Sequence, residues 1–181
     1  DVFADGEDSG TADINMVIAH LREPERVETK LEPEDMERFQ RASYYDLVML
    51  GSARKAYATF FRTLATTDGA TLVHCTGGKD RTGWAVASLL TLLGVPREDV
   101  FADYLISDQN IRRMFSGVID DFEARGGQPA VMDALFGARR SYLTVSFDTV
   151  EREFGSIETY FSDGLGLEDE VTEALREGFL G

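Results

Sequence analysis

The C-terminal half of the chain has the pattern of a helical protein. Apolar residues recur three or four positions apart in the stretches 97–115, 118–124, 139–154 and 167–179. This spacing puts the apolar residues on one face of a helix, and glycine or proline residues separate the stretches. We therefore predict one helix in each of these four stretches.

The same spacing occurs in the N-terminal half. Between residues 44 and 64 the apolar and aromatic positions recur three or four apart, which predicts one helix packed on a single face. Pro33 is followed by two acidic residues, as is typical of a first helical turn, and residues 13–22 have the spacing of another short helix. Residues 1–13 are acidic and contain Gly, Ser and Thr, so we expect disorder there.

A predicted strand is followed directly by a predicted buried helix. Residues 70–75 are rich in β-favouring side chains, and residues 84–93 are apolar on nearly every face of a helix. This order predicts an α/β domain over residues 1–181, with a mostly parallel sheet flanked by helices and a helix-rich C-terminal half. A buried parallel strand needs neighbours on both sides. Either further strands are hidden in the pattern or, as we expect, a sheet-bearing N-terminal portion is missing from this chain.

Charge and composition narrow the classes of function. The 18 basic and 33 acidic residues give a net charge of −15, which argues against binding of nucleic acid except at a locally basic site. No stretch approaches the roughly 20 apolar residues of a membrane span, and the first residues do not resemble a signal peptide. One cysteine and two histidines argue against a disulfide scaffold or a structural zinc site. We predict a cytoplasmic protein without metal or cofactor, although export without a cleaved signal leaves no trace in a sequence.

The candidate chemistry lies in residues 74–83, between the predicted strand and the buried helix. Five residues separate Cys75 from Arg81, and three of them are Gly or Thr, which allow backbone to wrap closely around a phosphate. The N–H groups of such a loop and the start of the following helix form an anion site. The positive electrostatic field of these N–H groups and of the helix start also favours the Cys75 thiolate, which can attack phosphorus. The planar Arg81 side chain can hold two phosphoryl oxygens in the transition state.

The other residues of this loop have predicted supporting roles. Asp80 can protonate the leaving oxygen and then activate water, which makes it the third predicted catalytic residue with Cys75 and Arg81. Lys79 adds charge for a further anionic group. His74 is expected either to fix the loop by hydrogen bonding or to carry a proton. The predicted phosphate-binding residues are Thr76, Gly77, Gly78, Lys79, Thr82 and Gly83.

The sequence from His74 to Gly83, HCTGGKDRTG, resembles the signature of protein tyrosine phosphatases. Its form Gly-Lys-Asp-Arg-Thr-Gly is similar to that of the atypical bacterial and fungal branch. The resemblance continues through residues 94–96 and 100–105. It implies metal-free hydrolysis of a phosphomonoester through a cysteinyl-phosphate, with Asp80 as the general acid. It also implies a phosphotyrosine protein as substrate, with phosphoserine, phosphothreonine or a phosphoinositide as alternatives.

Several alternatives stay open on the sequence alone. Asp46 lies 29 residues before Cys75, near the position of the loop-borne acid in conventional members of that family, and therefore competes with Asp80. Cys75 could instead be an inert buried cysteine. The chain could also be a catalytically inactive phosphate-binding module, although the intact Cys75, Asp80 and Arg81 favour an enzyme. The oligomeric state has no signature in this sequence.

Overall fold

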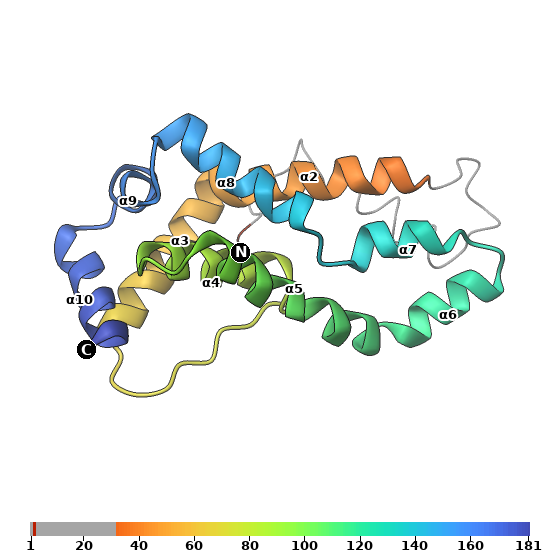
Figure 1. Cartoon of the computed structure of the whole chain (residues 1–181), viewed down its shortest axis with the longest axis horizontal. Helices are drawn as coiled ribbons and strands as arrows, with labels where there is room; N and C mark the ends of the chain where they lie inside the picture. Colours follow the sequence, from red (N-terminus) through yellow and green to blue (C-terminus); the bar gives the residue numbers. More distant parts are fainter. Residues whose placement is uncertain (1, 3–31) are drawn as a thin grey trace.

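The structure, a computed structural model, describes Val2 and residues 32–181. Helices joined by mostly short connections make up this part of the chain (Figure 1). In chain order these elements are α2 (Pro33–Met49), α3 (Gly51–Thr66), α4 (Asp80–Leu92), α5 (Arg97–Met114), α6 (Ser116–Ala124), α7 (Pro129–Phe136), α8 (Arg140–Phe154), α9 (Ile157–Thr159), the π-helix η2 (Tyr160–Gly164) and α10 (Asp169–Leu180). None of the described helices is long and apolar enough to cross a membrane.

Helix α2 begins at Pro33, as predicted, and carries two acidic residues in its first turn. The fixed φ of proline suits a first helical position, and the acidic side chains favour the positive end of the helix dipole. The single helix predicted over residues 44–64 is wrong, because Leu50 is extended, with φ −61° and ψ 136°, and separates α2 from α3. Both helices pack on the same core, so the apolar spacing continues across the break and does not reveal it.

The helices predicted in the C-terminal half are confirmed as α5, α6, α8 and α10, with small differences at their ends. Helix α7 was missed because Pro129 was interpreted as a break in the pattern. Pro129 instead occupies the start of α7, where its missing N–H costs no hydrogen bond. The short helix predicted over residues 13–22 and the predicted disorder of residues 1–13 lie outside the described residues, apart from Val2.

The predicted parallel sheet is wrong, because the described part of the chain contains no strand. Residues 70–75 belong instead to a long connection between α3 and α4, and Leu72 is 86% exposed (Figure 1). β-Favouring side chains form a strand only where a neighbouring strand pairs with their backbone. Among the residues that the structure describes, this segment has no such neighbour.

The main core surrounds α4. Trp84 of α4 is fully buried, and its indole N–H donates to the hydroxyl of Tyr160 at 3.2 Å. The Phe147 ring of α8 meets the Trp84 ring edge-on, with 5.4 Å between the ring centroids. Figure 1 shows α8 beside α2 and α10 beside α3, and these pairs are in contact. The core therefore fixes α4, and with it the loop of residues 74–79 that precedes it.

A smaller apolar cluster attaches α6 and α7 to α2. Its buried members are Met36, Phe122, Val131, Met132 and Ala134. Figure 1 shows α6 and α7 at the end of the molecule opposite α10. Helix α7 is therefore held by its own packing against the first half of α2, apart from the main core.

Two leucines of different burial test this description of the core. Leu47 is fully buried, so Leu47→Ala should lower the free energy of unfolding by about 2–5 kcal/mol, the usual range for such a cavity. Leu72→Ala removes the same atoms from an exposed position and should change it by less than about 0.5 kcal/mol. Urea denaturation followed by circular dichroism measures both. A similar loss from both variants would show that residues 70–75 are packed.

Candidate active site

Two glycines shape the loop before α4. Gly78 has a φ of +70°, a conformation that side chains with a Cβ rarely adopt. Gly77 lies against α5, and a Cβ added there would be 2.7 Å from Cδ1 of Ile111. The small residues predicted for this loop therefore have two separate causes, which are the turn at Gly78 and the close packing at Gly77.

The thiol of Cys75 lies among hydrogen-bond donors. The Gly78 N–H donates to Sγ at 3.2 Å. Burial alone would raise the pKa of the Cys75 thiol, but the nearby hydroxyl and N–H of Thr82 and the N–H groups of Gly78 and Gly77 lower it to about 7. Much of Cys75 is therefore thiolate at neutral pH, which is the form that acts as a nucleophile.

Arg81 is held at the same loop by its side chain and its backbone. Its Nη2 donates to Oγ1 of Thr76 at 3.2 Å, and its carbonyl accepts the hydroxyl of Tyr57 from α3 at 3.2 Å. Tyr57 is buried, and burial raises its pKa well above the ordinary value, so the hydroxyl stays protonated and can donate. The first turn of α4 is therefore fixed to α3.

His74 is exposed, and its Nδ1 donates to the carbonyl of Cys75 at 3.2 Å. This contact lies within the loop itself. From the sequence we expect His74 either to fix the loop by hydrogen bonding or to carry a proton. This hydrogen bond belongs to the first of these two roles.

Asp80 is the first residue of α4 and lies beside two buried tyrosines. Its Oδ1 is 2.8 Å from Nζ of Lys79. The hydroxyls of Tyr44 and Tyr104 are 2.6 Å apart, and burial, followed by the negative charge of Asp80, raises the pKa of Tyr44 well above its ordinary value. A carboxylate, an ammonium and two phenol groups thus meet at the start of α4.

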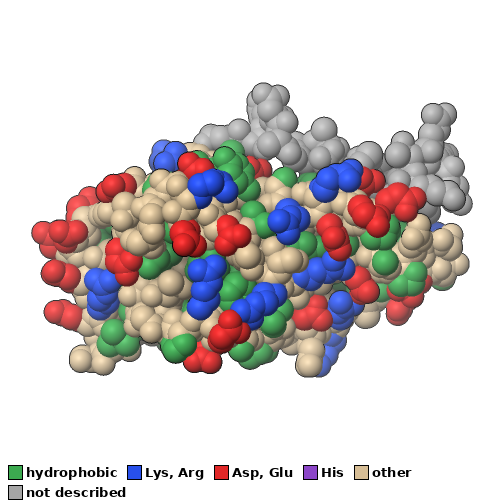
Figure 2. Space-filling model, turned by 45° about the horizontal axis from the view of Figure 1, so that its top comes forward, with side chains coloured by type: hydrophobic (Ala, Val, Ile, Leu, Met, Phe, Trp, Pro, Cys, Tyr) green, Lys and Arg blue, Asp and Glu red, His purple; other side chains and the backbone are tan. Residues whose placement is uncertain are grey.

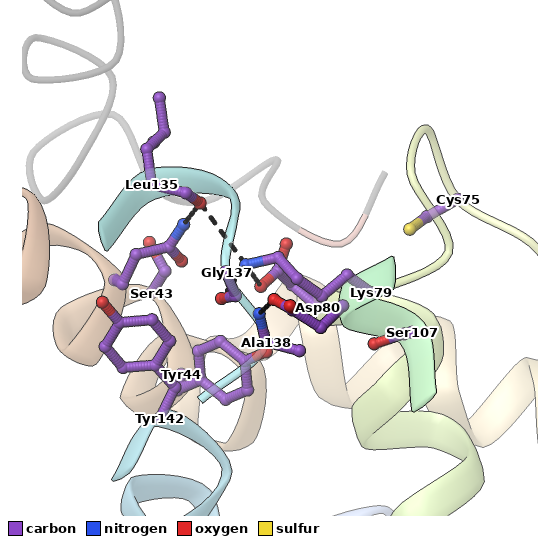
Figure 3. A network of polar contacts seen from close by, with 12 residues as sticks. Ser43, Tyr44, Cys75, Lys79, Asp80, Ser107, Leu135, Gly137, Ala138 and Tyr142 are labelled. Atoms are coloured by element: carbon purple, nitrogen blue, oxygen red, sulfur yellow. Dashed lines mark hydrogen bonds and ion pairs between the residues drawn. The ribbon is translucent and has the colours of Figure 1, made fainter. Parts of the chain in front are cut away.

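The side chain of Lys79 is directed away from Cys75 toward the end of α7 (Figure 3). It is only 3% exposed, and its Nζ donates to the carbonyls of Gly137 at 3.2 Å and Leu135 at 3.4 Å. The same atom lies 5.8 Å from the centre of the Tyr142 ring. The expected contact of Lys79 with phosphate stays a prediction, and in this structure backbone carbonyls hold its ammonium.

An open pocket of about 260 Å³ adjoins the loop. Cys75, Arg81 and Thr82 line it together with mostly apolar and aromatic residues, which are Val2, Ala56, Tyr57, Phe60, Val73, His74 and Ala85. Asp46 is not among the lining residues and lies within α2, rather than on a loop. No group of three or more His, Cys, Asp or Glu side chains in the described residues could hold a metal ion.

Sequence reasoning missed several residues that hold the site. Tyr57 and Tyr104 fall within two predicted helices, and nothing in the sequence analysis singled out their hydroxyls, which contact Arg81 and Tyr44. The carbonyls at the end of α7, which hold Lys79, belong to a helix that the apolar spacing does not predict. The available signal was the number of tyrosines at core positions, because a buried phenol needs a hydrogen-bond partner.

Comparisons with known proteins identify the family of the chain. The tyrosine phosphatase family matches the chain over residues 7–181. The chain is 37% identical over 137 residues to a "putative tyrosine-protein phosphatase" of Cupriavidus necator, covering 75% of this chain and 49% of that protein. It is 30% identical over 121 residues to the triple specificity protein phosphatase PtpB of Mycobacterium tuberculosis, covering 61% and 44%. A tyrosine-protein phosphatase of Nostoc commune is 44% identical over 59 residues, covering 32% and 20%.

The chain thus spans about half the length, or less, of the curated relatives that it matches. The family match, in contrast, includes nearly the whole of the chain and the loop described above. The chain belongs to the tyrosine phosphatase family.

Proposed function

We propose that this protein hydrolyses phosphomonoesters through a cysteinyl-phosphate intermediate, with phosphotyrosine in a protein as its substrate. The observation that carries the proposal is the position of the Cys75 thiol at the loop before α4, where its Sγ accepts the Gly78 N–H at 3.2 Å and nearby hydroxyl and N–H groups lower its pKa to about 7. The same donors are suited to phosphoryl oxygens, which carry negative charge. Arg81 lies at the same loop, where its guanidinium contacts Thr76.

In the first step the Cys75 thiolate attacks phosphorus, and the bond between phosphorus and the substrate oxygen breaks. Asp80 gives its proton to that leaving oxygen, while Arg81 and the loop N–H groups bind the equatorial oxygens. In the second step Asp80 takes a proton from water, which attacks phosphorus and releases phosphate. The Thr82 hydroxyl stabilises the departing thiolate, since it is one of the groups that lower the pKa of Cys75.

The substrate class rests on the relatives. Two of them are named tyrosine-protein phosphatases, which favours phosphotyrosine, and a third is named a triple specificity phosphatase. Phosphoserine, phosphothreonine and phosphoinositides are therefore the alternatives to measure beside phosphotyrosine. A panel of these substrates, tested with the full-length protein in the presence of a chelator, measures the preference and the predicted independence from metal.

Cys75→Ser should abolish turnover of every phosphomonoester while the protein still binds inorganic phosphate. A serine hydroxyl is close to a thiol in size but far harder to ionise, so the nucleophile is lost and the anion site is kept. Release of phosphate from an aryl phosphate measures turnover, and calorimetry measures binding. Appreciable turnover by this variant would exclude the covalent mechanism.

The reactivity of Cys75 should follow a pKa near 7. Iodoacetamide reacts with the thiolate, so the rate of alkylation should rise with pH and reach half its maximum near pH 7, below the midpoint of about 8.5 for an ordinary cysteine. Thr82→Val removes one donor and should move the midpoint to higher pH. A midpoint near 8.5 in the unaltered protein would contradict the described environment of the thiol.

Asp80→Asn should affect substrates according to their leaving groups. An acid matters most where the departing oxygen is strongly basic, so phosphotyrosine hydrolysis should fall by about 10²–10⁴-fold, and hydrolysis of an activated aryl phosphate should fall much less. Steady-state kinetics with aryl phosphates of graded leaving groups measures this. Asp46→Asn is the matched control. A leaving-group-dependent loss in Asp46→Asn alone would assign the acid to α2.

A further inference from the structure

We propose that Lys79 is a positioning residue that fixes the carboxylate of Asp80 by anchoring it to the end of α7. This inference rests on the proposed function, because it concerns how the proposed acid is held. Lys79 precedes Asp80 in the chain and is 3% exposed, and its Nζ contacts Asp80, Leu135 and Gly137 (Figure 3). These three contacts of Nζ are the observations that indicate a positioning role for Lys79.

The burial of this ammonium requires an explanation. A buried charge is costly unless partners replace its lost water, and Lys79 has three such partners. The ammonium has three N–H donors. Two of them are donated to the carbonyl oxygens of Gly137 and Leu135 at 3.2 and 3.4 Å, and Asp80 Oδ1 lies 2.8 Å from Nζ as an ion-pair partner, without the geometry of a hydrogen bond. Turning Lys79 toward a phosphate would break its hydrogen bonds to the two carbonyls.

The end of α7 provides a fixed platform for this ammonium. The last carbonyls of a helix have no partner within the helix and carry its negative dipole end, so they accept from cations and side-chain donors. Tyr142 of α8 donates to the carbonyl of Ala134 at 2.8 Å, and Gln40 of α2 donates to that of Leu135 at 2.5 Å. Side chains from α8, from α2 and from the loop of residues 74–79 therefore converge on the end of α7.

The contact with Lys79 restrains the direction of the Asp80 carboxylate. Oδ1 of Asp80 is buried and faces the ammonium, whereas the side chain as a whole is 33% exposed. The contact between Oδ1 and the Lys79 ammonium fixes the rotation of the Asp80 carboxylate. The other carboxylate oxygen, Oδ2, is then left to exchange a proton with the leaving group. A misplacement of a reacting group by about 1 Å can cost about 10²-fold in rate. Loss of Lys79 should therefore impair proton transfer while leaving the phosphate site in place.

A double-mutant cycle in the full-length protein tests this inference. Lys79→Met should lower kcat for phenyl phosphate, whose leaving group is poor, by about 10–100-fold. It should change kcat for a dinitrophenyl phosphate, KM, and the inhibition constant of inorganic phosphate by less than about threefold. In an Asp80→Asn background Lys79→Met should have no further effect on phenyl phosphate, because a residue that acts through Asp80 has nothing left to position.

Two outcomes would overturn the inference. Losses that add in the double variant would show that Lys79 acts independently of Asp80. Weakened inhibition by phosphate, by about tenfold or more, with an unchanged kcat for phenyl phosphate would make Lys79 a phosphate ligand. If Lys79→Met does not fold, Lys79→Gln keeps a donor for the carbonyls but loses the charge, and it should give the same kinetic pattern.

Tyr142→Phe is the matched control for the platform. It removes the hydrogen bond to Ala134 but keeps the ring beside Lys79 and the ammonium itself. We expect a change of less than about threefold in kcat for phenyl phosphate. An equal loss in both variants would assign the effect to α7 in general and overturn the specific role of Lys79. Failure of the unaltered full-length protein to hydrolyse any aryl phosphate would instead contradict the proposed function.

Discussion

The position at which α4 begins is the constraint on which the rest of the site depends. From the core side, Trp84 is buried against Phe147 and Tyr160, and Tyr57 donates to the carbonyl of Arg81. From the other side, Lys79 binds the end of α7. Because the first turn of α4 is held on both sides, the loop before it keeps the N–H groups of Gly77, Gly78 and Thr82 near the Cys75 sulfur, where they lower its pKa.

The parts that could be predicted from the sequence are those with local causes. Cys75 and Arg81 share one loop, whose small residues and following helix are visible in ten consecutive positions, and the helices of the C-terminal half follow from apolar spacing. The features that could not be predicted depend on residues that lie far away in the sequence. Residues 70–75 have strand-like side chains but no neighbouring strand in the described part of the chain, and the acceptors of Lys79 are backbone carbonyls 56 and 58 residues further on. A backbone carbonyl has no signature in a sequence.

The net charge of −15 makes a local anion trap necessary, because the protein as a whole repels a phosphorylated ligand. On the face that Figure 2 shows, Lys and Arg side chains are scattered among the acidic ones. Backbone N–H groups solve this problem at short range, since they are fixed partial charges that need no basic surface. Their field acts on the sulfur, would act equally on a phosphoryl group bound there, and weakens quickly outside the loop.

The loop also keeps the ammonium of Lys79 away from the thiolate of Cys75 (Figure 3). The groups that lower the pKa of Cys75 most are uncharged donors, namely the hydroxyl and N–H of Thr82 and the N–H groups of two glycines. The Lys79 ammonium lies instead on the side of the loop that faces α7, next to Asp80 (Figure 3). An ammonium held against the sulfur would stabilise the thiolate further, and a more stable thiolate is a weaker nucleophile. Placing the cation beside the carboxylate lets the nucleophile and the proposed acid be adjusted separately, although Cys75 and Asp80 are only five positions apart in the chain.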